Sequence, residues 1–397
     1  MAITVVDPTE KDGVPFLRGI LTRSLVKAGL SFDDAYRIAD RIRDEMDDDE
    51  RISADELAER VAAALKGENL SRALRAYRGR RKRTVPIDVV DRDGHPSPFS
   101  KSVLARSLEV CAIPDSRQFA ITAQLERDLL ALGNTEVSSL DIARRTYDLL
   151  QKQETPQVAR RYLAWIEFTD SGRPLFLLVG GSTGTGKSTV SAEIAHRLNI
   201  VRTQSTDMLR EVMRLILPQR LLPTLHASTY NAWELLPTAA MTRATGENLL
   251  IQGYLAQASH VALGIEGVFQ RGEREQVSIL LEGVHMHPAL QKALCKGSEA
   301  VTVPIVLAVL KKKTLKRQLT GRALQVSARR AERYLKHFDS IWSLQGFLLA
   351  QAEALGIPII ANADLEETIK LVMEHVAAAL VKQYGKDPRE VLQLESA

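Results

Sequence analysis

The chain has 397 residues, 45 % of them hydrophobic and 26 % charged, and this balance excludes disorder as the general state. Lysine plus arginine total 53 against 49 acidic residues, and the net charge of +4 is too small for a dedicated nucleic-acid binder. The two cysteines, Cys111 and Cys295, exclude a disulfide scaffold and a multi-cysteine zinc site.

The sequence contains no signal for export or for a membrane. No stretch reaches the roughly 18 consecutive apolar residues of a membrane helix. The N-terminus has neither the basic region nor the apolar core of a signal peptide. We therefore expect a soluble, cytoplasmic protein of two or three domains, with neither nucleic acid nor membrane as a partner.

A repeat occupies the first part of the chain. Pro15-Phe16 recurs as Pro98-Phe99, and residues 23–25 recur at the same spacing as Arg106-Ser107-Leu108. We predict two copies of one mainly helical module, at 1–83 and 84–168. Ser31 and Ser53 are placed to cap helices of the first copy. The basic run 78–83 at the seam is interpreted as a solvated linker rather than a nucleic-acid contact.

The second copy resembles the ATP-cone, a regulatory nucleotide-binding domain. The resemblance rests on Val90–Gly94, on Pro98–Lys101 and on the helical pattern that follows, and the first copy matches more weakly. It implies an adenine nucleotide effector whose phosphates Arg92 and Lys101 would neutralise. The alternative for each copy is a module that has kept the fold and lost the ligand.

The strongest motif in the chain is a phosphate-binding loop between a buried-strand pattern at 175–179 and a helical pattern at 187–198. Backbone N–H groups of such a loop point at phosphates beside the positive end of a helix dipole. Lys187 would reach the β- and γ-phosphates, and Ser188 would bind Mg²⁺. We expect Mg·ATP on Gly181, Ser182, Thr183, Gly184, Thr185, Gly186, Lys187, Ser188 and Thr189.

Apolar runs at 278–281, 304–310 and 358–361 alternate with helical stretches over residues 169–397. This alternation predicts an α/β domain with a parallel sheet and helices on both faces. Asp207, Glu282 and Asn362 fall at strand ends, where such sheets bind ligands. Asp207 is either a helix cap or the carboxylate that orients the acceptor hydroxyl. Glu282 is either a carboxylate that holds Mg²⁺ through water or an exposed acid.

Basic side chains follow in places that suit a second anion. Arg210 and Arg214 share a helix face close to Asp207. The run from Lys311 to Arg333 resembles the lid of small-molecule kinases, which implies catalytic roles for Arg322 and Arg329; the alternative is a solvated basic helix. For His285 we expect a substrate contact rather than a zinc ligand.

From Leu175 to about Leu380 the chain resembles the 2-phosphoglycerate kinase family. Four stretches carry the resemblance, at 205–214, 225–233, 279–285 and 333–341. It implies ATP-dependent phosphorylation of 2-phosphoglycerate to 2,3-bisphosphoglycerate. The catalytic residues would be Lys187, Asp207, Arg322 and Arg329, and the substrate residues would be Arg210, Arg214, His226, Tyr230 and His285.

Two alternatives to this function stay open at the level of sequence. Residues 286–289 depart from the family pattern, so the first alternative is a kinase of the same fold that acts on another small phosphorylated or hydroxy acid. The second is a nucleotide-sensing regulator without kinase activity. A homo-oligomer is compatible with either function.

Overall fold

A computed structural model describes residues 3–6, 14–46, 51–68, 70–81, 87–237, 246–324 and 328–393. The chain divides into two compact units, Met1–Ile87 and Asp88–Ala397. No helix within the described residues combines the length and the apolar character that crossing a membrane requires.

The first unit is a small three-stranded sheet covered by four helices. Its elements are β1 (Thr4–Val6), β2 (Val14–Pro15), α1 (Arg18–Lys27), α2 (Phe32–Asp44), β3 (Arg51–Ser53), α3 (Ala54–Gly67) and α4 (Ser71–Arg81). Strand β1 pairs antiparallel with β2 and parallel with β3. Ser31 and Ser53 cap α2 and α3 as predicted, and Ser53 forms a full capping box with Glu56.

The second unit begins with the same order of elements. These are β4 (Asp88–Val90), β5 (Pro96–Pro98), α5 (Lys101–Val110), α6 (Asp115–Ala131), β6 (Glu136–Ser138), α7 (Ser139–Gln153) and α8 (Pro156–Ser171). Strand β4 again pairs antiparallel with the following strand, β5, and parallel with the later one, β6. Residues 3–81 and 88–171 therefore share one topology.

The predicted start of this second module, at 83/84, lies outside the described residues, whereas its predicted end can be compared with the structure. Helix α4 continues to Arg81, and residues 82–86, which include the end of the predicted basic linker, lie outside the described residues. The predicted boundary at 168/169 falls inside α8. Val110 of α5 and Phe168 of α8 belong to the same buried cluster as Leu175 and Val372 of the following domain. The module and the α/β domain thus share one core.

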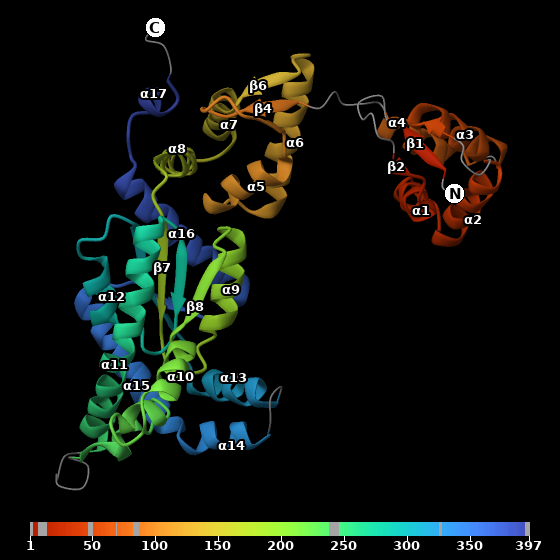
Figure 1. The fold of residues 1–397 in the computed structure, drawn as a ribbon. Helices are drawn as coiled ribbons and strands as arrows, with labels where there is room; N and C mark the ends of the chain where they lie inside the picture. The colour runs from red at the N-terminus through yellow and green to blue at the C-terminus, as the bar shows by residue number, and fades with distance from the viewer. Residues whose placement is uncertain are drawn as a thin grey trace. The chain divides into compact units, whose positions relative to one another are not determined.

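The α/β domain is built on a five-stranded parallel sheet, as the alternation of strands and helices predicts. Its elements are β7 (Leu175–Gly180), α9 (Lys187–Arg197), β8 (Arg202–Ser205), α11 (Gly246–Glu275), β9 (Ile279–Glu282), α12 (Pro288–Cys295), β10 (Val301–Ala308), α15 (Phe338–Leu355), β11 (Ile359–Ala361), α16 (Leu365–Gln383) and α17 (Pro388–Val391). The strands run in the order β11-β10-β7-β9-β8. Leu175, Leu177 and Val179 of β7 face the cluster that includes α9 and α16, whereas Phe176 and Leu178 face the cluster of α11 and α12. Figure 1 shows α9 and α11 on opposite sides of the sheet.

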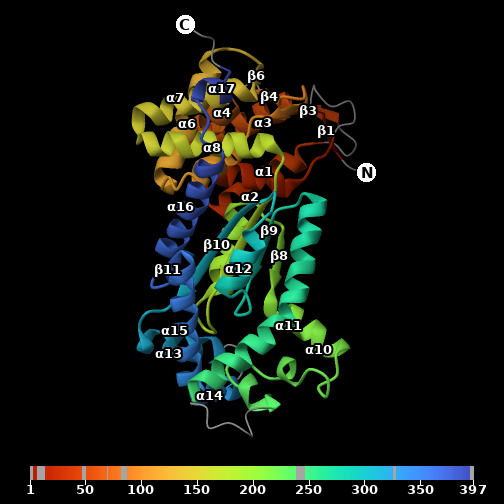
Figure 2. The same cartoon turned by 90° about the vertical axis from the view of Figure 1, so that its left-hand side faces the viewer.

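Asp207 was expected at a strand end, and a strand does end shortly before it. Strand β8 (Arg202–Ser205) is exposed or half-buried and carries no apolar run, because it lies at the edge of the sheet. It leads into α10 (Thr206–Ile216). Helices α13 (Lys312–Leu324) and α14 (Ala328–Lys336) lie at the same end of the domain as α10 in both views (Figures 1 and 2). This end contains the site described below.

The shared core predicts where the chain can be shortened. The first unit has a buried cluster of its own, so removal of residues 1–87 should change the free energy of unfolding of the remainder by less than about 0.5 kcal/mol. Removal of residues 1–168 deletes Val110 and Phe168 from the common cluster and should destabilise the α/β domain by about 3 kcal/mol or more. Urea unfolding of both truncated chains tests this, and equal stabilities would contradict it.

Candidate active site

The loop between β7 and α9 is held in a conformation that only glycine adopts easily. Gly181, Gly184 and Gly186 have φ angles of 138°, 87° and 83°. A Cβ atom at Gly186 would lie 2.2 Å from Nδ2 of Asn362. Gly186 is also the N-cap residue of α9, so the loop ends at a helix N-terminus, where backbone N–H groups bind anions.

Asn362, which follows β11, secures this loop from the neighbouring part of the sheet. Its side-chain Nδ2 donates to the carbonyl oxygen of Thr185 at 2.9 Å, and its Oδ1 accepts from the hydroxyl of Thr368 at 3.1 Å. The sequence marks Asn362 only as a polar residue at a strand end. It holds the loop through a hydrogen bond to a residue 177 positions away in the sequence.

The first residues of α9 face a carboxylate at the end of β9. The Oγ of Ser188 donates to Oε1 of Glu282 at 3.0 Å. Lys187 is buried, and its Nζ donates to the carbonyl oxygen of Ser182 at 2.7 Å. Hydroxyl and carboxylate oxygens are ligands that Mg²⁺ prefers. The alternative of an exposed acid at position 282 is wrong, because Glu282 is buried.

Two cavities meet at these residues. The larger, about 470 Å³, is lined by Gly184, Gly186, Lys187, Ser188, Thr189, Gln318, Asn362, Ala363 and Leu365. The smaller, about 190 Å³, is lined by Thr183, Lys187, Ser188, Ser205, Asp207, Arg210, Ser228, Thr229, Tyr230, Glu282, Val284 and Tyr334. Lys187 and Ser188 border both. The arrangement can hold two ligands whose reacting groups meet at the start of α9.

Asp207 points into the smaller cavity and is not the cap of its helix. The N-cap of α10 is Ser205, whose side chain accepts from the backbone N–H of Asp207 at 3.3 Å. The Asp207 carboxylate is 62 % exposed and lies 4.0 Å from Nε of Arg210. The cap interpretation is therefore wrong. A carboxylate open to the cavity can accept a proton from a bound hydroxyl group.

Arg210 and Arg214 share a face of α10 but differ in their surroundings. The Nη1 of Arg210 donates to the carbonyl oxygens of Leu225 and Ala227, at 3.1 and 2.7 Å, while its buried Nε has no hydrogen-bond partner in the described part of the chain. Arg214 pairs with both carboxylate oxygens of Glu211 at 2.9 Å, and Arg210 reaches one of them at 3.0 Å. Arg210 lines the smaller cavity and Arg214 does not.

Comparison with known proteins supports a kinase. A 2-phosphoglycerate kinase from Pyrococcus furiosus is 33 % identical over 308 residues, which cover 77 % of this chain and 99 % of the relative. The chain belongs to the 2-phosphoglycerate kinase family. A relative of the same name from Thermococcus kodakarensis is 35 % identical, covering 70 % of this chain and 91 % of its own, and one from Methanocaldococcus jannaschii is 34 % identical, covering 71 % and 88 %. Residues 87–171 match the ATP cone domain.

The segment before α11 forms another wall of the smaller cavity of this kinase. Tyr230 is buried and lines the cavity, with its ring 5.0 Å from that of His337. His226 instead donates from Nε2 to the carbonyl oxygen of Leu217 at 2.9 Å and is absent from the cavity lining. Ser228, Thr229 and Tyr334 also line it. They belong to the family-like stretches 225–233 and 333–341, although the sequence analysis did not name them individually.

His285 lies behind the cavity rather than in it. Its ring is fully buried and both nitrogens are engaged by protein groups, Nδ1 with Thr206 at 3.0 Å and Nε2 with Gln257 at 3.1 Å. Burial lowers the pKa of His285 to about 4. This geometry does not suit the direct substrate contact that was predicted. The neighbouring His287 caps α12 and packs edge-on against Tyr254.

The predicted lid corresponds to α13 and α14. Arg322 and Arg329 belong to these helices, but their side chains lie outside the described residues. The role of both arginines stays a prediction. Gln318 of α13 lines the larger cavity, so this helix borders the side of the site where the loop lies.

The predicted effector residues of the ATP cone lie at the β4–β5 turn and at the start of α5. Arg92 pairs with Asp170 of α8 at 2.8 Å and donates to the carbonyl oxygen of Val391. Lys101 pairs with Glu126 of α6 at 2.9 Å. A nucleotide phosphate would compete with these carboxylates for both cations, and the effector role stays a prediction.

The capping geometry separates the two functions that the sequence left open for Asp207. Ser205→Ala should lower the free energy of unfolding by about 1 kcal/mol, because it removes the cap. Asp207→Asn should change this energy by less than about 0.5 kcal/mol and lower the rate of phosphoryl transfer at least about 10²-fold. Thermal unfolding and steady-state turnover test both variants. A fully active Asp207→Asn protein would contradict the catalytic role.

Proposed function

We propose that this kinase transfers the γ-phosphoryl group of Mg·ATP to the free hydroxyl group of 2-phosphoglycerate and so forms 2,3-bisphosphoglycerate. The observation that carries the proposal is the pair of cavities that share Lys187 and Ser188. Transfer of a phosphoryl group needs mainly correct positioning of two ligands and neutralisation of their charge. Membership of the family supports the choice of acceptor.

The donor would bind in the larger cavity. Its phosphates would lie on the loop Gly181–Thr189, where backbone N–H groups converge at the start of α9. The ammonium group of Lys187 would neutralise the β- and γ-phosphates. Ser188 and Glu282 would hold Mg²⁺, which supplies further charge neutralisation between these phosphates.

The acceptor would bind in the smaller cavity, whose volume suits a three-carbon acid. The buried Nε of Arg210 is a charged donor available to the acceptor's phosphate or carboxylate. The acceptor hydroxyl oxygen would attack the γ-phosphorus, and the bond from this phosphorus to the β–γ bridging oxygen would break. The hydroxyl proton would pass to Asp207. Arg322 and Arg329 would close over the transferring group from α13 and α14.

The departure from the family pattern after His285 does not favour a different acceptor. Met286 is fully buried in the cluster between the sheet and α11, and His287 caps α12. Neither residue lines the smaller cavity. The departure therefore concerns packing behind the site rather than the surface that would touch the acceptor.

An acceptor screen tests the proposal. The chain should form ADP with 2-phosphoglycerate. With 3-phosphoglycerate or glycerate the rate should be at least about 10²-fold lower, because the phosphate group of the acceptor is then at another position or missing and the hydroxyl group is not correctly placed. Lys187→Ala should lower turnover on the order of 10³-fold without unfolding. Coupled ADP assays and product analysis measure both. Turnover with another acid only would favour the alternative kinase, and no turnover with any would favour a nucleotide sensor.

We further propose that the ATP cone regulates the kinase through contacts at the far end of α9. Arg197 pairs with Glu109 of α5 at 3.3 Å, with Glu193 at 2.9 Å and with Glu366 of α16 at 3.1 Å. Helix α16 begins three residues after Asn362, the brace of the phosphate loop. A movement of α5 on nucleotide binding would reach this loop through α9 and α16. Residues 3–81, with the same topology, form a second cone-like module.

The regulatory proposal predicts a response to adenine nucleotide that does not follow occupancy of the active site, such as inhibition at high ATP. Removing both cations with Arg92→Ala and Lys101→Ala should abolish it, whereas Arg18→Ala in the first module should blunt it less. Coupling between two sites is typically worth about 5- to 150-fold in affinity. Initial rates against ATP concentration measure the response. An unchanged response in the double variant would contradict the proposal.

A further inference from the structure

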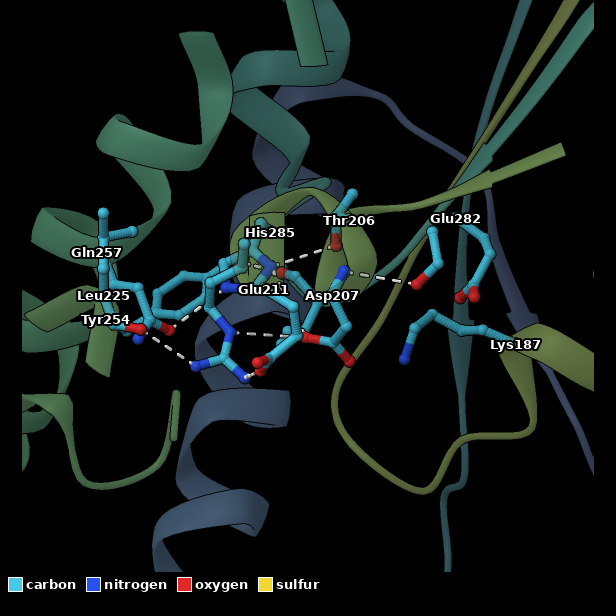
Figure 3. A network of polar contacts seen from close by, with 12 residues as sticks. Lys187, Thr206, Asp207, Glu211, Leu225, Tyr254, Gln257, Glu282 and His285 are labelled. Carbon is cyan, nitrogen blue, oxygen red and sulfur yellow. Dashed lines mark hydrogen bonds and ion pairs between the residues drawn. The ribbon is translucent and has the colours of Figure 1, made fainter. Parts of the chain in front are cut away.

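A chain of buried polar side chains runs behind the smaller cavity (Figure 3). It joins Thr206, the first residue of α10, to His285 in the loop after β9 and to Gln257 of α11. All three side chains are fully buried. Buried polar groups are costly unless every donor and acceptor finds a partner, so the pattern of hydrogen bonds in this chain is strongly constrained.

The hydrogen bonds of Gln257 place a proton on Nε2 of His285. The amide nitrogen of Gln257 donates both of its hydrogens, one to the carbonyl oxygen of Thr224 and one to that of Ala227. Its Oε1 must then accept, and it does so from Nε2–H of His285. The other ring nitrogen, Nδ1, lies 3.0 Å from the Thr206 hydroxyl oxygen, which can either donate or accept. Burial lowers the pKa of His285, so the imidazole is neutral, carries its proton on Nε2 and accepts from Thr206 at Nδ1.

The two ends of this chain reach the two sides of the acceptor cavity. At one end, Gln257 holds the carbonyls of Thr224 and Ala227, directly before the cavity residues 228–230. At the other end, Thr206 precedes Asp207, whose Oδ1 lies 3.9 Å from Nδ1 of His285. Gly283 allows this approach, because a Cβ atom there would lie 1.8 Å from the Thr206 hydroxyl oxygen.

We propose that His285 and Gln257 are positioning residues that fix the carboxylate of Asp207 relative to the acceptor-binding segment 228–230. The inference rests on the proposed function, since it assigns the smaller cavity to the acceptor. The neutral imidazole is essential to this role. If Nδ1 were protonated, it could no longer accept the hydrogen bond from the Thr206 hydroxyl, and the ring would face Asp207 as a cation. The attraction of this cation would hold the Asp207 carboxylate away from the hydroxyl group of the bound substrate.

Burial favours this neutral form, and it is the main cause of the lowered pKa of His285. The carboxylate of Asp207 favours protonation, whereas the cationic groups of Arg210 and Lys187 and the imidazole of His287 oppose it. Protonation should therefore affect the wild-type chain only near pH 4 and leave the kinase unaffected by His285 at neutral pH.

Gln257→Glu tests the positioning role through a pH profile. A carboxylate beside Nε2 favours the imidazolium, so the acid limb of kcat/KM for 2-phosphoglycerate should move up by at least about one pH unit. Loss of the two donated hydrogen bonds should raise the KM for 2-phosphoglycerate on the order of 10-fold or more, with the KM for ATP unchanged. A profile and an acceptor KM like those of the wild type would overturn the proposal.

Gln345→Glu is the matched control. Gln345 is also a buried glutamine of the α/β domain with two hydrogen bonds to backbone, both to Val309, and among the described residues it has no hydrogen bond to a histidine. Its substitution should lower stability without moving the acid limb or the acceptor KM. An equal shift of the acid limb in both variants would mean that the effect is general destabilisation, and it would overturn the proposal.

Thr206 provides a second pair of variants with little change in volume. Thr206→Val removes the hydroxyl that binds Nδ1 and should lower kcat on the order of 10²-fold, whereas Thr206→Ser keeps the hydroxyl and should retain turnover within a few fold. Equal kcat values for the two variants would overturn the proposal.

The wild-type chain allows a check that needs no substitution and no turnover. Nitrogen-15 NMR of its histidines should show one ring that stays in the neutral Nε2–H form down to about pH 5. If every histidine titrates near neutral pH, the proposal fails, whatever the acceptor is. If this resonance is present but 2-phosphoglycerate is not phosphorylated, the proposed function fails instead.

Discussion

Close packing around the loop between β7 and α9 is the constraint on which the rest of the site depends. A Cβ atom at Gly180 would lie 2.3 Å from the carbonyl oxygen of Met286, and one at Gly186 would meet Asn362 at 2.2 Å. The loop can approach its neighbours this closely only because it has no side chains at these positions. Asn362 then anchors the loop by a hydrogen bond to the carbonyl of Thr185. A fixed loop gives bound phosphates a fixed place relative to the sheet.

The position of this loop also explains why two cavities meet. Strands β7 and β9 are adjacent and parallel, so the start of α9 and the carboxylate of Glu282 come to the same edge of the sheet. The hydrogen bond from Ser188 to Glu282 closes the gap between them. Strand β8, next to β9, brings Asp207 to the same edge. The two cavities thereby meet at one lysine, Lys187.

The ATP cone is joined to the kinase domain through packing rather than through a linker. Helices α5 and α8 contribute Val110, Ala164 and Phe168 to the main core of the α/β domain. The ion pairs of Arg197 lie at the same junction, with Glu109 on the cone side and Glu366 on the kinase side. Side chains in a closely packed interior move together, so a change in the cone can reach the loop between β7 and α9.

The sequence by itself determined the features that depend on neighbours within a few positions. These include the glycine-rich loop with its flanking strand and helix, the caps at Ser31 and Ser53, the parallel α/β class and the family. Tertiary structure decided the rest, because partners distant in the chain compete for each side chain. The spacing places Arg210 and Arg214 on one face of α10, and both contact Glu211, but only Arg210 also bonds the carbonyl oxygen of Leu225 and borders the cavity. His285 follows a strand end like a ligand-binding residue, yet Thr206 and Gln257, 79 and 28 positions away, occupy both of its ring nitrogens.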